Sequence, residues 1–173
     1  MALVFQYSSN CSESEINSED RLRGEARFDR IAETVDDYEI AFDVYSTRRR
    51  CAASDIVRKD RVKVWGVLYE LPDYLLNRDT ARAYERRSFD EIEGEGRNYR
   101  RESIQVRRPN GDIVSALTYT VKAPQFGLRT NIEYVGHIVR GLREHAVPDE
   151  YIAKVKAIAA VNNPDIATEV GRL

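Results

Sequence analysis

The sequence predicts a single α+β domain over residues 1–173, with a twisted or closed β-sheet and helices packed outside it. The predicted order is one strand, a short helix, further strands, a helix, a hairpin and two helices. This order lacks the regular alternation of a doubly wound fold. The stretch from Val62 to Leu71 is apolar on both faces, which is typical of a strand buried on both sides or lining a barrel. The length suits one domain with a buried core, and no internal repeat or low-complexity linker interrupts it.

Two strands and a short helix are predicted before that stretch. Leu3 to Tyr7 is apolar and aromatic, which indicates a strand. The polar residues Ser8 to Ser14 predict a loop, and the capping-box spacing of Ser12 and Glu15 predicts a short helix there. From Tyr38 to Val44 apolar and polar residues alternate, as in a strand with one buried face.

A helix is predicted after this strand region, from Asp79 to about Glu91, with Asn77 or Asp79 as its cap. We expect Tyr84 and Phe89 to anchor this helix inward. Gly94 follows, and glycine suits the left-handed turn that ends many helices.

The clearest hairpin joins the stretch Arg101–Arg108 to the stretch Ile113–Val121. Asn110 and Gly111 stand in the connecting turn. These residue types suit the positive φ values that a tight hairpin turn needs.

Two helices are predicted after the hairpin. The first begins near Thr130 and Glu133, which have capping-box spacing, and Pro148 opens the second. The tail from about Asn162 carries weaker signals, and we expect it to be loosely held.

The overall charge excludes some classes of protein. Hydrophobic residues make up 42% and charged residues 32% of the chain, which is typical of a globular protein. The net charge of −2 argues against a dedicated nucleic-acid binder. We interpret the local runs Arg48–Arg50 and Arg107–Arg108 as solvated strand ends or loops.

The cysteines and the N-terminus predict a location in the cytoplasm. Cys11 and Cys51 are too few and too far apart for a disulfide framework or a metal site, so we expect reduced thiols. The first residues lack the basic and long apolar regions of a secretion signal. No apolar run elsewhere is long enough to span a bilayer, so we predict no membrane partner.

A series of short motifs runs along most of the chain, from about residue 4 to about residue 158. Their order and spacing are the distinctive feature, since each motif alone is common. The motifs are Tyr7-Ser8-Ser9-Asn10, Val64-Trp65-Gly66-Val67-Leu68-Tyr69, Phe89-Asp90-Glu91-Ile92-Glu93-Gly94, Tyr99-Arg100, Tyr134 seven residues before Gly141, and Val147-Pro148-Asp149-Glu150-Tyr151. In this order the sequence resembles the γ-glutamylcyclotransferases and their AIG2-like relatives.

The resemblance implies a small twisted mixed β-barrel with helices packed outside. It also implies a cofactor-independent enzyme of the lyase or acyltransferase type, related to glutathione metabolism. In the implied reaction the free α-amine of a γ-glutamyl group attacks its own side-chain carbonyl, releasing 5-oxoproline and an amine or amino acid. The partner is then a small γ-glutamyl molecule, and no metal is required. For the oligomeric state, both a monomer and a homodimer are compatible with the resemblance.

Glu93 matches the catalytic glutamate of the family. A carboxylate at the C-terminal end of a helix faces the negative end of the helix dipole, which favours the protonated form. Such a group is suited to carrying protons. The alternative is that Glu93 is an exposed member of the acidic run formed with Asp90, Glu91 and Glu95.

The loop from Tyr7 to Cys11 matches the family's substrate-binding loop, and its backbone N–H groups suit a carboxylate or an oxyanion. We therefore predict Tyr7, Ser8, Ser9, Asn10 and Cys11 as substrate-binding residues. Ser8 replaces a family glycine, and a serine would strain or narrow the loop if that position needs a positive φ. Cys11 also fits a small buried filler.

Tyr134 matches a family tyrosine that faces the site. It equally fits the first core residue of an amphipathic helix. Tyr99 and Arg100 either contact the substrate or pack at a strand edge.

Two other functions stay open at this point. The chain is either a relative that acts on the γ-glutamyl arm of a larger metabolite or isopeptide, or a non-catalytic binding module that keeps the fold. Ser8 favours these alternatives, whereas Glu93 favours catalysis. A buried Glu93 beside free amides would indicate an enzyme, and a Glu93 closed off against an arginine would indicate a scaffold.

Overall fold

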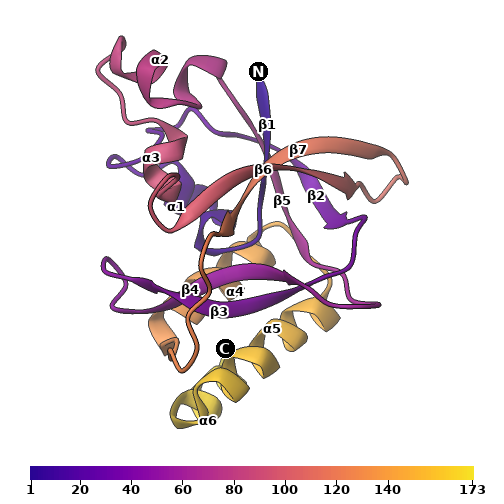
Figure 1. The fold of residues 1–173 in the computed structure, drawn as a ribbon. Helices are drawn as coiled ribbons and strands as arrows, with labels where there is room; N and C mark the ends of the chain where they lie inside the picture. The colour runs from indigo at the N-terminus through magenta and orange to yellow at the C-terminus, as the bar shows by residue number, and fades with distance from the viewer.

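Five strands close into a barrel in the computed structural model, which describes residues 1–173 (Figure 1). Neighbouring strands pair antiparallel except for β1 and β7, whose parallel pairing closes the barrel. This confirms the predicted mixed barrel with helices outside. Around the barrel the order is β1 (Ala2–Gln6), β5 (Trp65–Leu71), β2 (Arg27–Thr34), β6 (Tyr99–Arg107) and β7 (Ile113–Val121).

Strand β5 lies between β1 and β2 and is buried on both faces, as its sequence predicts. Val67, Leu68 and Tyr69 are fully buried in succession. The Tyr69 hydroxyl donates to the carbonyl of Cys11 at 2.8 Å. The strand therefore also supports the loop that follows β1.

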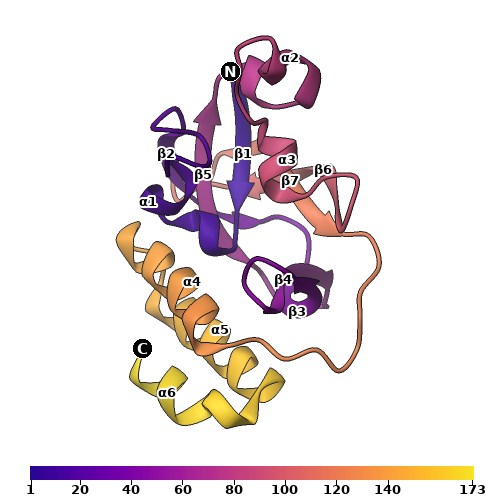
Figure 2. The same cartoon turned by 90° about the vertical axis from the view of Figure 1, so that its left-hand side faces the viewer.

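The predicted alternating strand is β3 (Tyr38–Ser46), which pairs with β4 (Cys51–Arg58) in a separate two-stranded sheet. Its alternate residues Ile40, Phe42 and Val44 are buried. Figure 2 shows this hairpin beside the barrel, with the helices α4 and α5 next to it. The turn of residues 47–50 thus projects from a sheet that is not part of the barrel.

The predicted helix over residues 79–91 is divided in two. The first part is α2 (Arg78–Arg82), capped by Asn77, and the second is α3 (Phe89–Glu93). Between them Glu85 has a φ of 54°, which interrupts the helical backbone. Phe89 is buried as expected, but Tyr84 is 63% exposed and packs at a tilt against Tyr74 instead of entering the core.

The C-terminal quarter forms three helices: α4 (Ile132–Glu144), α5 (Asp149–Asn162) and α6 (Ala167–Arg172). The cap of α4 is Asn131, whose side chain accepts from the N–H of Tyr134, and not Thr130 as the spacing suggested. None of the helices is both long and apolar enough to cross a membrane.

The expectation of a loosely held tail is wrong. Val170 on α6 is buried and α6 packs against α5. Asn162 and Asn163 connect this region to the backbone of Thr130, one accepting from its N–H and the other donating to its carbonyl. These bonds and the burial of apolar side chains fix the tail on the helical layer.

Candidate active site

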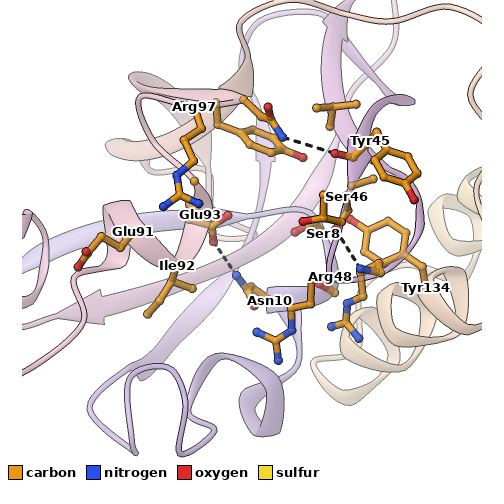
Figure 3. A pocket seen from close by; sticks show the side chains of 18 of the residues that line it. Ser8, Asn10, Tyr45, Ser46, Arg48, Glu91, Ile92, Glu93, Arg97 and Tyr134 are labelled. Carbon is orange, nitrogen blue, oxygen red and sulfur yellow. Dashed lines mark hydrogen bonds between the residues drawn. The ribbon is translucent and has the colours of Figure 1, made fainter.

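A cavity of about 270 Å³ lies where the end of β1, the β3–β4 turn and α3 meet (Figure 3). Five of the seven predicted site residues line it: Ser8, Ser9, Asn10, Glu93 and Tyr134. Tyr7 lies behind them, and with Ser8 and Glu93 it lines a second cavity of about 20 Å³. Cys11 lines neither cavity.

The loop after β1 is held by bonds from several parts of the fold. The hydroxyl of Tyr7 donates to the carbonyl of Tyr119 at 2.6 Å, which ties the loop to β7. Ser9–Cys11 then form a short 3-10 helix, η1. Ser8 has a φ of −114°, an ordinary extended conformation that serine adopts freely. The strain expected from replacing the family glycine is therefore absent.

This loop offers several hydrogen-bond donors. The backbone N–H groups of Ser8, Ser9 and Asn10 donate to no acceptor in the protein. All three residues line the cavity. Because buried N–H groups are normally paired, such a group of donors is suited to a carboxylate or an oxyanion.

Cys11 has a structural role in this arrangement. It is fully buried, and its thiol donates to the carbonyl of Gln6 at 3.0 Å. Burial raises the pKa of the Cys11 thiol well above its usual range. The thiol is thus neither exposed nor ionised, which excludes it as a nucleophile.

Helix α3 places Glu93 at the cavity. Ser88 and Glu91 form a capping box at its start, and Gly94 ends it with a φ of 76°. Asp90 accepts hydrogen bonds from the Tyr119 hydroxyl on β7 and from Arg101 on β6. These bonds attach the short helix to the barrel, so that its last residue, Glu93, has a fixed position.

Glu93 is half-buried and has one direct side-chain partner. The side-chain nitrogen of Asn10 donates to its Oε1 atom at 2.6 Å. Burial raises the pKa of Glu93 above its usual value of 4.5, while the bond from Asn10 and the charge of Arg21 limit the rise. The sequence suggested that the helix dipole raises the pKa of Glu93. In the structure, burial is the largest cause of the raised pKa.

Arg21 is a site residue that sequence reasoning missed. It is only 7% exposed, and its guanidinium donates to the side-chain oxygen of Asn10. This bond fixes the Asn10 amide so that its nitrogen faces Glu93. The surrounding stretch is highly charged and has no clear periodicity, so the sequence contained no signal for it.

Arg21→Gln is expected to raise the pKa of Glu93 further, because it removes a cation that favours the carboxylate. Activity that needs ionised Glu93 would then begin to fall at a higher pH. The measurement is the acid limb of the pH profile of kcat/KM, with the exposed Arg23→Gln as a matched control. An acid limb that stays in place or moves to lower pH would contradict the assigned effect of Arg21.

Tyr134 contacts both the cavity and the β3–β4 sheet. Its hydroxyl accepts from the N–H of Ser54 at 3.1 Å and lies 2.8 Å from the Ser54 hydroxyl. Tyr99, which also lines the cavity, donates to the Ser54 carbonyl at 2.8 Å. The two tyrosines therefore connect this hairpin to α4 and to β6, whereas Arg100 does not line the cavity.

Tyr134→Phe is expected to lower the free energy of unfolding by about 1–3 kcal/mol, since it leaves the buried N–H of Ser54 without an acceptor. Denaturant unfolding would measure the change. Tyr84→Phe, which alters an exposed tyrosine, is the control. Equal stability of the two variants would show that the bond to Ser54 contributes nothing.

The arginine run Arg48–Arg50 lies in the β3–β4 turn, as the prediction of a solvated strand end or loop allows. The sequence did not indicate that Arg48 and Arg49 also line the cavity. Arg21, Arg87 and Arg97 join them from three other segments. The sequence separates these segments by up to 76 positions, and only the fold brings them together.

The described residues contain no cluster of three or more His, Cys, Asp or Glu side chains that could hold a metal ion.

Comparison with protein families gives one match: residues 63–155 fit the model of the AIG2-like family. No curated protein matches the chain.

Several solved structures share the fold. One described as a gamma-glutamyl cyclotransferase is 22% identical, with a TM-score of 0.74 over 91% of this chain and 87% of its own. An uncharacterized human protein is 24% identical, with a TM-score of 0.73 and the same coverage. YkqA from Bacillus subtilis is 20% identical, with a TM-score of 0.70 over 91% of this chain and 54% of its own.

Proposed function

The chain belongs to the AIG2-like family, and from this membership and the site geometry we propose that it is a γ-glutamyl cyclotransferase. The proposed reaction converts a γ-glutamyl amide to 5-oxoproline and a free amine or amino acid. The fold shared with a structure described as a gamma-glutamyl cyclotransferase is consistent with this proposal.

One observation carries the proposal: a half-buried carboxylate, Glu93, shares a cavity with three unengaged backbone N–H groups. Burial raises the pKa of Glu93, and a carboxyl group of raised pKa is better suited to take and return a proton. N–H groups of a fixed loop can stabilise an oxyanion without reorganising during the reaction. Together they supply the functions that an intramolecular aminolysis needs.

The reaction follows from these parts. Glu93 takes a proton from the substrate's α-ammonium group, and the free amine attacks the side-chain carbonyl to close a five-membered ring. The N–H groups of Ser8, Ser9 and Asn10 hold the α-carboxylate or the oxyanion that forms. Protonated Glu93 then gives its proton to the departing amine as the amide bond breaks. The ring nitrogen loses its second proton through Glu93 to the released amine, which leaves a neutral lactam and restores the carboxylate. Tethering of the nucleophile supplies much of the rate.

The alternative of a non-catalytic binding module predicts that Glu93 is paired with a cation and closed off. Its direct partner is instead the neutral side chain of Asn10, and it lies at an open cavity. These two observations support the enzyme over the module.

The test is to incubate the purified protein with a panel of γ-glutamyl amino acids and amines and to measure 5-oxoproline and the released amine by mass spectrometry. We expect the two products in equal amounts from at least one substrate. A folded protein that releases 5-oxoproline from no member of the panel would contradict the proposal.

A further inference from the structure

The cavity carries more positive charge than the proposed reaction uses. Five arginines line it, but only two acidic residues do, Glu91 and Glu93. Glu91 is engaged in the capping box of α3. The proposed mechanism assigns the substrate's α-carboxylate and the oxyanion to backbone N–H groups. Arg21 orients Asn10, but the other four arginines have no role in that mechanism.

The arginines differ in depth and in their partners. Arg21 and Arg49 are largely buried and share Glu15, which lies 3.6 Å from one and 2.7 Å from the other. Arg48, Arg87 and Arg97 are exposed at the mouth of the cavity. In Figure 3, Arg97 and Arg48 lie on either side of the bonded pair Asn10–Glu93.

The mouth arginines are weakly engaged within the protein. Arg97 makes no ion pair or side-chain hydrogen bond. Arg48 is 3.0 Å from Asp20, but both side chains are half-exposed, and such pairs contribute little. Arg87 donates only to the carbonyl of Asp20. All three guanidinium groups are therefore available to a ligand.

We propose that the mouth arginines recognise a side-chain carboxylate on the leaving group, so that the preferred substrates are γ-glutamyl derivatives of acidic amino acids or acidic peptides. This inference rests on the proposed function and adds the class of leaving amine. When the γ-glutamyl carbonyl lies near Glu93, the leaving amine is directed toward the opening of the cavity. A side-chain carboxylate there can accept charge-assisted hydrogen bonds from guanidinium groups.

The experiment compares γ-glutamyl-glutamate with γ-glutamyl-glutamine, which have nearly the same shape and differ in one charge. We expect kcat/KM to be about tenfold higher for γ-glutamyl-glutamate, as one partly exposed charge-assisted contact can provide. Arg97→Gln and Arg48→Gln should each lower kcat/KM for γ-glutamyl-glutamate more than for γ-glutamyl-glutamine, and so reduce this preference. High salt should weaken the preference in the native protein.

Arg172→Gln is the matched control, because Arg172 lies on α6, away from the residues that line the cavity. It should keep the full preference. Equal kcat/KM for the two substrates in the native protein would overturn the inference and leave the proposed function in place.

A binding measurement separates the inference from the reaction. Glu93→Gln should bind γ-glutamyl-glutamate more tightly than γ-glutamyl-glutamine in calorimetry, and Arg97→Gln added to it should abolish the difference. Neither the native protein nor its variants need to release 5-oxoproline for this test. Tighter binding of γ-glutamyl-glutamate would still support an acidic ligand at the mouth of the cavity. Equal binding of both compounds would overturn it.

Discussion

Glu93→Gln is expected to lower the rate of 5-oxoproline release by about a hundred- to ten-thousandfold, the usual contribution of a positioned acid–base group. Glutamine can still accept the hydrogen bond from Asn10, so the cavity keeps its shape. It cannot take the proton from the substrate ammonium group. The measurement is kcat of Glu93→Gln and of the native protein, at a saturating concentration of a substrate that the native protein converts.

The control for this prediction is Glu95→Gln, which makes the same chemical change two residues away. Glu95 does not line the cavity, and its variant should keep native activity. Release by Glu93→Gln at a rate close to native would exclude Glu93 as the acid–base group, even if the protein proves to be a cyclotransferase.

The same substitution should also change stability, in a direction set by the pKa. Burial raises the pKa of Glu93 above 4.5, its ordinary value, so the ionised carboxylate opposes folding. This cost is present above the raised pKa and disappears as pH falls toward 4.5. We therefore expect Glu93→Gln to increase Tm at pH 7.5 and to have little effect near pH 4.5. A lower Tm at pH 7.5 would mean that Asn10 and Arg21 outweigh the cost of burial.

Gly141→Ala is expected to destabilise the protein by about 2 kcal/mol or more and to displace the loop after β1, for which we propose substrate binding. Gly141 lies on the face of α4 that packs against η1. A Cβ atom there would lie 2.4 Å from the backbone nitrogen of Ser12 and 2.8 Å from the carbonyl carbon of Cys11. Neither backbone can move without shifting the loop or the helix.

Gly136→Ala on the same helix is the matched control. Its Cβ would meet only the side chain of Leu173, at an ordinary 3.8 Å. Alanine is the better helix former, so this variant should be as stable as the native protein or slightly more so. Thermal unfolding should separate the two by about 4–8 °C. Equal Tm values would show that the contact between α4 and η1 is loose.

The sequence predicted those parts of the fold that have a strong local pattern. The two apolar faces of β5, the alternation of β3 and the turn around Gly111 each follow from side-chain chemistry, and the structure confirms all three. The division of the helix at Glu85 was not predicted, because every residue there is compatible with a helix. The tail was misjudged because its burial depends on partners in distant segments.

The candidate site shows the same limit. The motif resemblance identified Glu93 and the loop after β1, and Ser8, Ser9 and Asn10 of that loop do meet Glu93 at one cavity. The arginines of that cavity belong to no motif, and their meeting depends on how four segments are placed by the barrel and the β3–β4 sheet. Ser8 was expected to strain the loop, but its backbone conformation is ordinary.

The parallel pairing that closes the barrel also affects how the site is assembled. Val4 on β1 pairs with Leu117 on β7, so the first strand reaches its final neighbour only after two thirds of the chain has been synthesised. Contacts between such distant positions slow folding. Since the loop after β1 is held by Tyr119 and α4, we expect the cavity to form among the last steps of folding. A nascent chain that lacks its C-terminal third would then lack this cavity.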